Sequence, residues 1–332
     1  MTNLDLLLLK GPPGGDVCRG LDDLRYNVLV NGIPANSDGM SELRIYIWLV
    51  FLSSPPLKTD TYLDLVRQGP SPAYNKIRND TFRTLATDPL FRRRVTENSL
   101  TRVLNAIAWR LHDAHEAKVN GWQSPPTMST AGSIDGPPRT SMSAHSVSGD
   151  TTASHGTSTT IGYVQGMNVL AAPLLYAARS ETQAFAAFST LISNELPSYI
   201  LPSMDGVHRG LRLVDEILMI VDPKLAAYLQ SKGMSAEIYG FASVLTMCAC
   251  TPPLPEVLAL WDFLFAYGTH LNLLCIVAQL VLIRDQLMEA ASPNQILRSF
   301  PPLQAAKVKA IAISFVPKIP EELYGRIVSH AR

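Results

Sequence analysis

The residues best suited to chemistry lie in the hexapeptide from Tyr163 to Asn168, where a glutamine and a glycine, Gln165 and Gly166, precede an apolar run. The glutamine amide carries a donor and an acceptor on one planar group, so it can orient a water molecule for attack without exchanging protons. Glycine adds no side chain and permits close approach to a ligand or partner. The following residues, Met167 to Ala178, read as a helix. These features predict a nucleophile-positioning loop. The alternative left open by these residues alone is that Gln165 only caps or fills a loop.

A second pair of polar side chains lies upstream, in the segment from Ile77 to Thr84. The spacing predicts a short helix on which Asp80 and Arg83 stand three residues apart, at neighbouring positions. The carboxylate would then hold the guanidinium at a fixed angle. The alternative is an ordinary surface ion pair, which contributes less than about 1 kcal/mol to stability.

An arginine and a water-orienting glutamine together are the groups that GTP hydrolysis needs, because one neutralises charge developing on the phosphates and the other aims the water. The chain has no phosphate-binding loop of its own, since the glycines between Gly11 and Gly15 lack the required Gly-Lys-Ser/Thr ending. The sequence therefore predicts that Arg83 and Gln165 act in trans, in the active site of another protein.

The sequence pattern predicts that all the elements that position these groups are helices. Apolar residues recur at helical spacing, as at Leu100, Val103, Leu104, Ile107 and Leu111. Three helix starts are signalled by a capping side chain before a proline, at Asp88-Pro89, Asp222-Pro223 and Ser292-Pro293. Alternating strands are absent from the pattern. The chain is therefore predicted to be all-α, with a dozen or more short helices.

One segment departs from this pattern, at about residues 120–160, where Ser, Thr, Gly and Pro dominate. Such a composition buries too little apolar surface to offset the entropy of ordering. We predict a disordered insertion here. Its many hydroxyl groups and Ser124-Pro125 raise the hypothesis of phosphorylation.

Composition excludes several classes of function. The 332 residues, enough for about two domains of ~150 residues, carry 28 basic and 28 acidic side chains, so no overall field favours nucleic acid or an acidic membrane. Leu6 to Leu9 is too short for a signal-peptide core, and Leu271 to Ile283 falls short of the ~20 residues of a membrane helix. We predict an intracellular, cytoplasmic protein that binds no nucleic acid and does not insert into membranes.

Cysteines and histidines give no sign of a metal site. The four cysteines lack paired spacing and predict buried free thiols in a reducing compartment; they are Cys18, Cys248, Cys250 and Cys275. His112, His115 and Glu116 lie near a predicted helix end, but their order matches no zinc-protease motif. We expect no metal and no cofactor.

In its two polar motifs the chain resembles the TBC family of GTPase-activating proteins, which share Ile-x-x-Asp-x-x-Arg and Tyr-x-Gln-Gly-Met. The matching residues are Ile77, Asp80 and Arg83, then Tyr163, Gln165, Gly166 and Met167. Further landmarks of the family follow in order, namely Arg44 and Trp48, Asp222-Pro223 with Leu225, and Leu260-Trp261-Asp262 with Gly268. The resemblance extends from about residue 20 to the C-terminus.

This resemblance implies an N-terminal extension at 1–19 and a two-lobed, all-α domain at 20–332, with lobes at about 20–180 and 181–332. It implies that Gln165 orients the water, that Arg83 stabilises phosphate charge and that Asp80 aims Arg83. Supporting roles are implied for Ile77, Tyr163, Gly166, Met167, Asn168, Arg44 and Trp48. GTP and Mg²⁺ would belong to the partner, a small Ras-like GTPase, so the chain would be an activator without a substrate site of its own.

The sequence around these motifs resembles the fungal Bub-type, cell-cycle-arrest branch of the family. The segments concerned are Lys76 to Thr81, Tyr163 to Tyr176, Ala236 to Gly240 and Leu260 to Gly268. This resemblance implies a GTPase of the mitotic-exit or septation-initiation network, a helper subunit, a place in the spindle-position checkpoint and residence at the spindle pole body. Two alternatives stay open: a non-catalytic scaffold for the GTPase and helper, and an activator of a Rab-type vesicle-traffic GTPase.

Two features depart from the family pattern. Arg83 and Gln165 are 82 positions apart (165 − 83), more than usual, and the insertion at 120–160 accounts for the excess. Looping it out would leave the two side chains adjacent. The second departure lies at Phe241 to Cys250, where small residues and two cysteines replace the family's aromatic residues. We expect it to affect packing or a partner surface in the C-terminal half, and not the chemistry.

Overall fold

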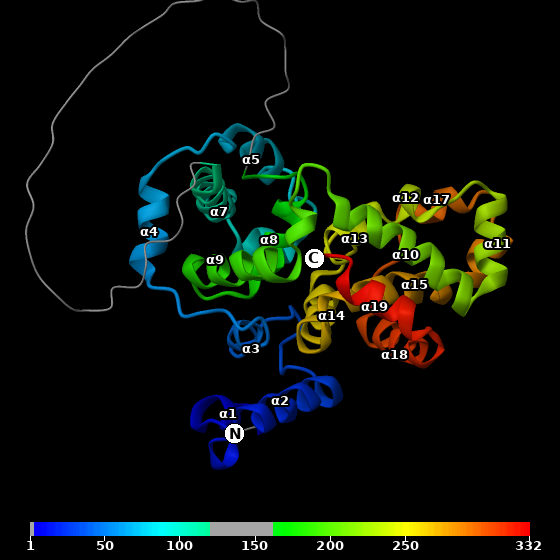
Figure 1. The fold of residues 1–332 in the computed structure, drawn as a ribbon, viewed down its shortest axis with the longest axis horizontal. Helices are drawn as coiled ribbons and strands as arrows, with labels where there is room; N and C mark the ends of the chain where they lie inside the picture. The colour runs from blue at the N-terminus through cyan, green and yellow to red at the C-terminus, as the bar shows by residue number, and fades with distance from the viewer. Residues whose placement is uncertain (1–2, 120–161) are drawn as a thin grey trace, which may run out of the picture.

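The computed structural model describes residues 3–119 and 162–332, and every regular element in these two ranges is a helix (Figure 1). The prediction of an all-α fold is therefore confirmed. The predicted insertion at 120–160 and the hypothesis of its phosphorylation lie outside the described residues.

The helices fall into an N-terminal and a C-terminal set. The first set is α1 (Asn3–Lys10), α2 (Val17–Asn31), α3 (Arg44–Phe51), α4 (Thr59–Arg67), α5 (Tyr74–Thr81), α6 (Pro89–Arg94), α7 (Glu97–Val119), α8 (Met167–Ala177) and α9 (Glu181–Thr190). The second set is α10 (Asp205–Val221), α11 (Pro223–Ser231), α12 (Ala236–Tyr239), α13 (Phe241–Leu245), α14 (Leu254–Tyr267), α15 (Asn272–Leu282), α16 (Arg284–Glu289), α17 (Pro293–Leu297), α18 (Ala305–Phe315) and α19 (Glu321–Ser329). Short 3₁₀ segments are η1 (Pro13–Gly15), η3 (Pro197–Tyr199), η4 (Thr269–Leu271) and η5 (Val316–Lys318), and η2 (Leu191–Glu195) is a π-helical turn.

The N-terminal set packs around α7, which contacts α4, α5, α8 and α9. The apolar positions predicted from helical spacing, including Leu100, Leu104 and Ile107, are buried on this helix. A helix with one apolar face must cover that face with other elements. Helix α7 therefore fixes α5 and α8, the two helices next to the predicted site.

The C-terminal set packs around α15, which contacts α10 and α18. Nine consecutive residues of α15, from Asn272 to Leu280, are buried. The apolar run judged too short for a membrane helix is thus a central core helix, as expected for a helix that is apolar on all sides.

Helix α14 joins the two sets, because it contacts α2, α3 and α8 on one side and α18 on the other. Figure 1 shows it between the two groups of helices. The two-lobed character of the fold is visible there, while the lobe boundary at 180/181 stays a prediction.

Two of the three predicted capping side chains act as expected. Asp88 accepts hydrogen bonds from the Leu90 and Phe91 N–H groups, and Asp222 accepts one from Leu225 N. The prediction for Ser292 was wrong in part: α17 begins at Pro293, but the serine side chain makes no capping hydrogen bond. Its main-chain carbonyl accepts from Gln295 N instead, at 3.2 Å.

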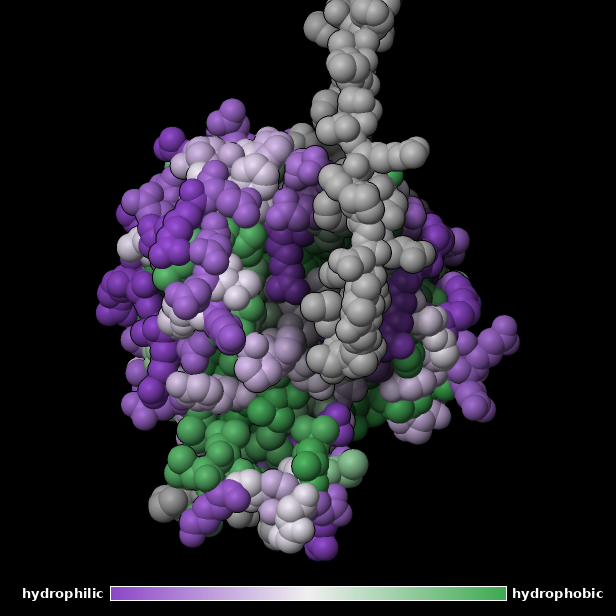
Figure 2. Space-filling model, turned by 60° about the vertical axis from the view of Figure 1, so that its left-hand side comes forward, coloured by the Kyte–Doolittle hydropathy of each residue, from purple (hydrophilic) through white to green (hydrophobic). Residues whose placement is uncertain are grey.

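The predicted extension at 1–19 contains α1 and the first residues of α2, and α2 packs against α14. Figure 2 shows hydrophobic side chains gathered on the lower part of the face in view, at the height of α1 and α2 in Figure 1. Exposed apolar side chains on these helices include Leu9, Val17, Tyr26 and Val30. This end of the molecule therefore presents apolar surface to solvent.

Candidate functional site

The two polar motifs meet at one surface pocket of about 480 Å³. Its lining includes both Arg83, from the turn after α5, and Gln165, from the turn before α8. The other lining residues are Thr84, Leu85, Gly166, Asn168, Val169, Met204, Phe241, Ala242, Leu245, Thr246 and Cys250. Residues that are 82 positions apart (165 − 83) in the sequence thus border the same pocket.

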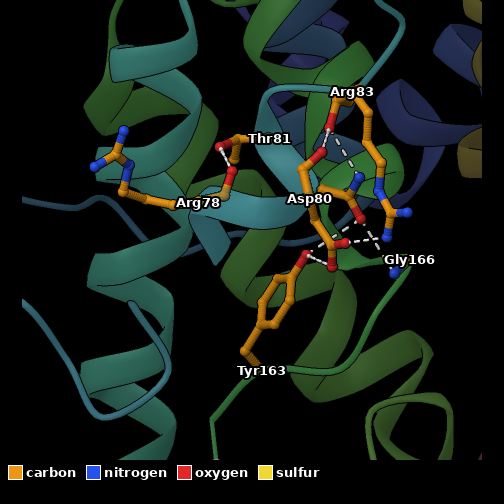
Figure 3. Close-up of polar contacts among 8 residues, drawn as sticks. Arg78, Asp80, Thr81, Arg83, Tyr163 and Gly166 are labelled. Carbon is orange, nitrogen blue, oxygen red and sulfur yellow. Dashed lines mark hydrogen bonds and ion pairs between the residues drawn. The ribbon is translucent and has the colours of Figure 1, made fainter. Parts of the chain in front are cut away.

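Asp80 connects Arg83 to the second motif. Its buried carboxylate accepts a hydrogen bond from the Arg83 guanidinium on one oxygen and from the Tyr163 hydroxyl, at 2.9 Å, on the other (Figure 3). The Arg83 side chain remains 54 % exposed. The buried carboxylate therefore holds the arginine by one guanidinium nitrogen, while the side chain stays about half exposed.

Tyr163 ties the second motif to the first. The side chain is buried, and burial, together with the neighbouring Asp80 carboxylate, raises the pKa of the Tyr163 hydroxyl above its ordinary value. The hydroxyl therefore keeps its proton at neutral pH and donates it to Asp80, because an ionised carboxylate only accepts hydrogen bonds.

The helix predicted over Ile77 to Thr84 begins and ends three residues earlier than expected, at Tyr74 and Thr81. Helix α5 ends at Thr81, so Arg83 lies in the following turn and not on the helix. The cause is local: the Thr84 hydroxyl donates to the Asp80 carbonyl at 2.8 Å, while the Thr84 N–H turns back to Thr81 O. The side chain thereby replaces the main-chain hydrogen bond that would have continued the helix.

The turn that presents Gln165 depends on its glycine. Gly166 has φ +104°, a backbone conformation that side chains disfavour, and a Cβ there would lie 2.6 Å from Leu245 Cδ2. Within the turn, Val164 N donates to the Met167 sulfur at 3.2 Å. The Gln165 side chain itself is exposed. A tight, glycine-dependent turn therefore presents the amide to solvent at the edge of the pocket.

The polar network joins Asn168, for which a supporting role was predicted, to Thr84, which was not among the predicted site residues. Asn168, which is buried, donates from Nδ2 to Thr84 Oγ1 at 2.8 Å and accepts from Gly166 N at 3.1 Å on Oδ1. Its Oδ1 also lies 3.2 Å from the Tyr163 hydroxyl. Thr84, which was not singled out, connects the two motifs directly. The available signal was a hydroxyl residue placed immediately after the arginine.

The segment from Phe241 to Cys250 forms the far wall of the pocket. Phe241, Leu245 and Cys250 all belong to the lining. Helix α13 packs on α10 and α15, and this packing brings the segment up to Arg83 and Gln165. The expectation that its unusual residues affect packing or a partner surface, and not the chemistry, stays a prediction.

The cysteines behave in two ways. Cys248 and Cys275 are buried, and burial raises the pKa of both thiols. Cys18 and Cys250 are exposed, so the prediction that the thiols are buried is wrong for these two. Cys250 is the last residue of the segment from Phe241 to Cys250 and lies at the surface of the pocket. Its apolar neighbours in the sequence do not cover its thiol.

Arg44 and Trp48 lie outside the pocket. Both bind the buried carboxylate of Asp262 on α14: Arg44 Nε and Nη2 at 2.9 and 3.0 Å, and the Trp48 indole N–H at 2.8 Å. Burial raises the pKa of Asp262, and the arginine opposes that effect. Ile77 is also away from the surface, because it lies on the buried face of α5. These three residues therefore support the fold that carries the site.

In the part of the chain that the structure describes, no three His, Cys, Asp or Glu side chains are grouped so as to hold a metal ion. Within residues 3–119 and 162–332, no helix has both the length and the apolarity needed to cross a membrane.

Comparison with known proteins gives consistent matches. The Rab-GTPase-TBC domain family matches residues 153–288. The chain is 42 % identical to cell division control protein 16 of Schizosaccharomyces pombe, over 99 % of this chain and 93 % of that protein. It is 37 % identical to the mitotic check point protein BUB2 of Saccharomyces cerevisiae, over 93 % and 91 %. The fold is similar to the crystal structure of the Ypt/Rab-GAP domain of Gyp1p, with a TM-score of 0.63 at 17 % identity, covering 89 % of this chain and 91 % of that one.

Proposed function

Because the chain belongs to the TBC family of Rab GTPase-activating proteins, we propose that Arg83 and Gln165 act together in the active site of a small Ras-like GTPase. The observation that supports this proposal is that both side chains border one surface pocket. Arg83 is half-exposed and Gln165 is exposed, so both are accessible to a docked partner.

The proposed chemistry divides between the two groups. The guanidinium stabilises negative charge that develops on the phosphates, and the glutamine amide orients the attacking water. An arginine supplied in this way accelerates GTP hydrolysis by ~10³–10⁵, which corresponds to roughly 4–7 kcal/mol of barrier. GTP and Mg²⁺ belong to the partner. Asp80 and Tyr163 contribute by holding Arg83, and they do not touch the nucleotide.

The relatives suggest the partner. One is called a cell division control protein and the other a mitotic check point protein. We therefore propose a GTPase of the mitotic-exit or septation-initiation network as substrate, with the chain acting in the spindle-position checkpoint. A helper subunit, and residence in the cytoplasm and at the spindle pole body, form part of the same proposal because the Bub-type resemblance implies them.

Purified proteins test the roles of both side chains. Arg83→Ala and Gln165→Ala should each abolish most stimulated phosphate release, while binding to the GTPase loaded with a non-hydrolysable GTP analogue stays close to wild type. Arg78→Ala is the matched control, because this arginine is exposed on α5, the helix that precedes the Arg83 turn, and points away from Asp80 (Figure 3). Wild-type stimulation by the Arg83→Ala protein would contradict the proposal.

The identity of the partner needs a wider assay. A panel of GTPases that includes Rab-type members, measured with and without candidate helper subunits, should show the strongest stimulation for the mitotic-exit type. Strongest stimulation of a Rab-type GTPase would contradict that assignment. If a variant lacking both side chains still restrains mitotic exit in cells, the chain acts there as a scaffold.

A further inference from the structure

Thr84 occupies a position between the two motifs that the proposed chemistry does not use. It follows Arg83 directly, its side chain is buried, and its hydroxyl contacts residues of both motifs. We propose that Thr84 is a positioning residue that fixes the Arg83 turn and the Gln165 turn relative to each other. This inference rests on the proposed function of those two side chains.

The direction of each hydrogen bond follows from the available protons. The Thr84 hydroxyl has one proton, and it points to the Asp80 carbonyl oxygen, 2.8 Å away, which can only accept. The hydroxyl therefore faces Asn168 with a lone pair and requires a donor there. The Asn168 Nδ2 group supplies that donor at 2.8 Å. The orientation of the Asn168 amide is fixed as a result.

The fixed amide continues the connection to the glutamine. With Nδ2 on Thr84, Asn168 presents Oδ1 to the N–H of Gly166, at 3.1 Å. That N–H belongs to the peptide bond whose carbonyl is that of Gln165. A single side-chain amide thus links the turn that carries Arg83 to the main chain of Gln165.

A second connection runs in parallel, from Tyr163 through its hydroxyl to the Asp80 carboxylate. This one reaches the Arg83 side chain, whereas the Thr84 connection reaches the main chain of the turn. Two buried attachments resist rotation of one turn against the other, which one attachment does not. Because a misplacement of about 1 Å can lower a rate by ~10²-fold, loss of one attachment should be visible in kcat.

Substitution of the hydroxyl tests the proposal. Thr84→Val keeps the shape but removes both hydrogen bonds, and it should lower stimulated kcat by about ten- to a hundredfold with little change in the KM for the GTPase. Thr84→Ser should restore most of the rate, since it keeps the hydroxyl. Thr190→Val is the matched control: Thr190 is also buried, and its hydroxyl donates to the Ala186 carbonyl at 3.0 Å, on helix α9, which carries neither turn. It should lose stability but not kcat.

The comparison with the catalytic variants separates the two proposals. Thr84→Val should cost less in an Arg83→Ala or Gln165→Ala background than in the wild type, because it acts through those residues. If both catalytic variants lose stimulation but Thr84→Val retains it, or if its effect is additive in both backgrounds, the inference on Thr84 fails and the proposed function stands. If Arg83→Ala and Gln165→Ala keep wild-type stimulation, the proposed function fails. Should Thr84→Val not fold, Thr84→Cys, a weaker hydrogen-bonding group of similar size, should give an intermediate rate, and a wild-type rate would contradict the inference.

Discussion

Replacing Gly166 by alanine should destabilise the protein through two separable effects. The first is backbone strain, because φ is +104° at this residue, and an L side chain costs about 1–2 kcal/mol there. The second is a collision, because the new Cβ would lie 2.6 Å from Leu245 Cδ2 and 3.0 Å from its Cγ.

The size of the second effect depends on how Leu245 responds. Its Cδ2 is the far end of a flexible side chain, so the collision should cost about 1–2 kcal/mol, toward the low end for overpacking. The two effects together predict a loss of about 2–4 kcal/mol in the free energy of unfolding. Stimulated hydrolysis should fall as well, because the Gln165 peptide must move with its neighbour.

Urea unfolding measures this loss against a matched glycine. Gly233 has φ +67° but nothing within 4 Å of an added Cβ, so Gly233→Ala should show the backbone strain alone. Leu245→Ala combined with Gly166→Ala should cost less than the sum of the two single changes, because the smaller side chain removes the collision. Equal losses for the two glycine variants, together with additivity at Leu245, would refute the reasoning.

Three further predictions concern other parts of the molecule. Alkylation of Cys250 with N-ethylmaleimide should lower stimulated hydrolysis, because the adduct occupies the pocket beside Arg83. Cys250→Ser should protect the protein from this inhibition, whereas Cys18→Ser should not. Equal inhibition of both variants in the phosphate-release assay would contradict this prediction. Burial lowers the pKa of His270 from 6.5 to about 4, so as the pH falls the unfolded chain takes up a proton at this residue before the folded chain does. The contribution of neutral His270 to the free energy of unfolding should therefore be fully present above pH 6.5 and should be lost toward pH 4, by roughly 3 kcal/mol at most. His270→Gln should flatten that dependence in urea unfolding, and an unchanged slope would argue against it. Asp262→Asn should lower the free energy of unfolding by about 3–5 kcal/mol, because it leaves Arg44 buried without its countercharge, and a loss below 1 kcal/mol in urea unfolding would contradict that reasoning.

Features that depend on neighbours in the sequence could be predicted. The starts of α6, α8 and α11 follow from Asp88-Pro89, the glycine before Met167 and Asp222-Pro223, since caps and proline act within one helical turn. The all-α class follows in the same way from helical spacing of apolar residues. The pairing of Asp80 with Arg83 was also local, although the helix proved to end before the arginine.

Features that depend on tertiary contacts could not be predicted. Nothing near Thr84 in the sequence indicates that Asn168 donates to it. The apolar neighbours of Cys250 suggested burial, but the packing of α13 turns this thiol toward the pocket. The seating of both turns against the segment that follows Phe241 likewise depends on packing between the two sets of helices.

The contact between Arg44 and Asp262 has a consequence for biosynthesis. The two residues are 218 positions apart, so at ~5–20 residues per second the ribosome adds the aspartate roughly 10–40 s after the arginine. During that interval α3 has no partner for its charge, and α14, which packs on α3 and α8, does not yet exist. A nascent chain that stops before residue 262 therefore carries Arg83 and Gln165 but lacks the helix that completes their support. We expect such fragments to be captured by chaperones and to activate no GTPase.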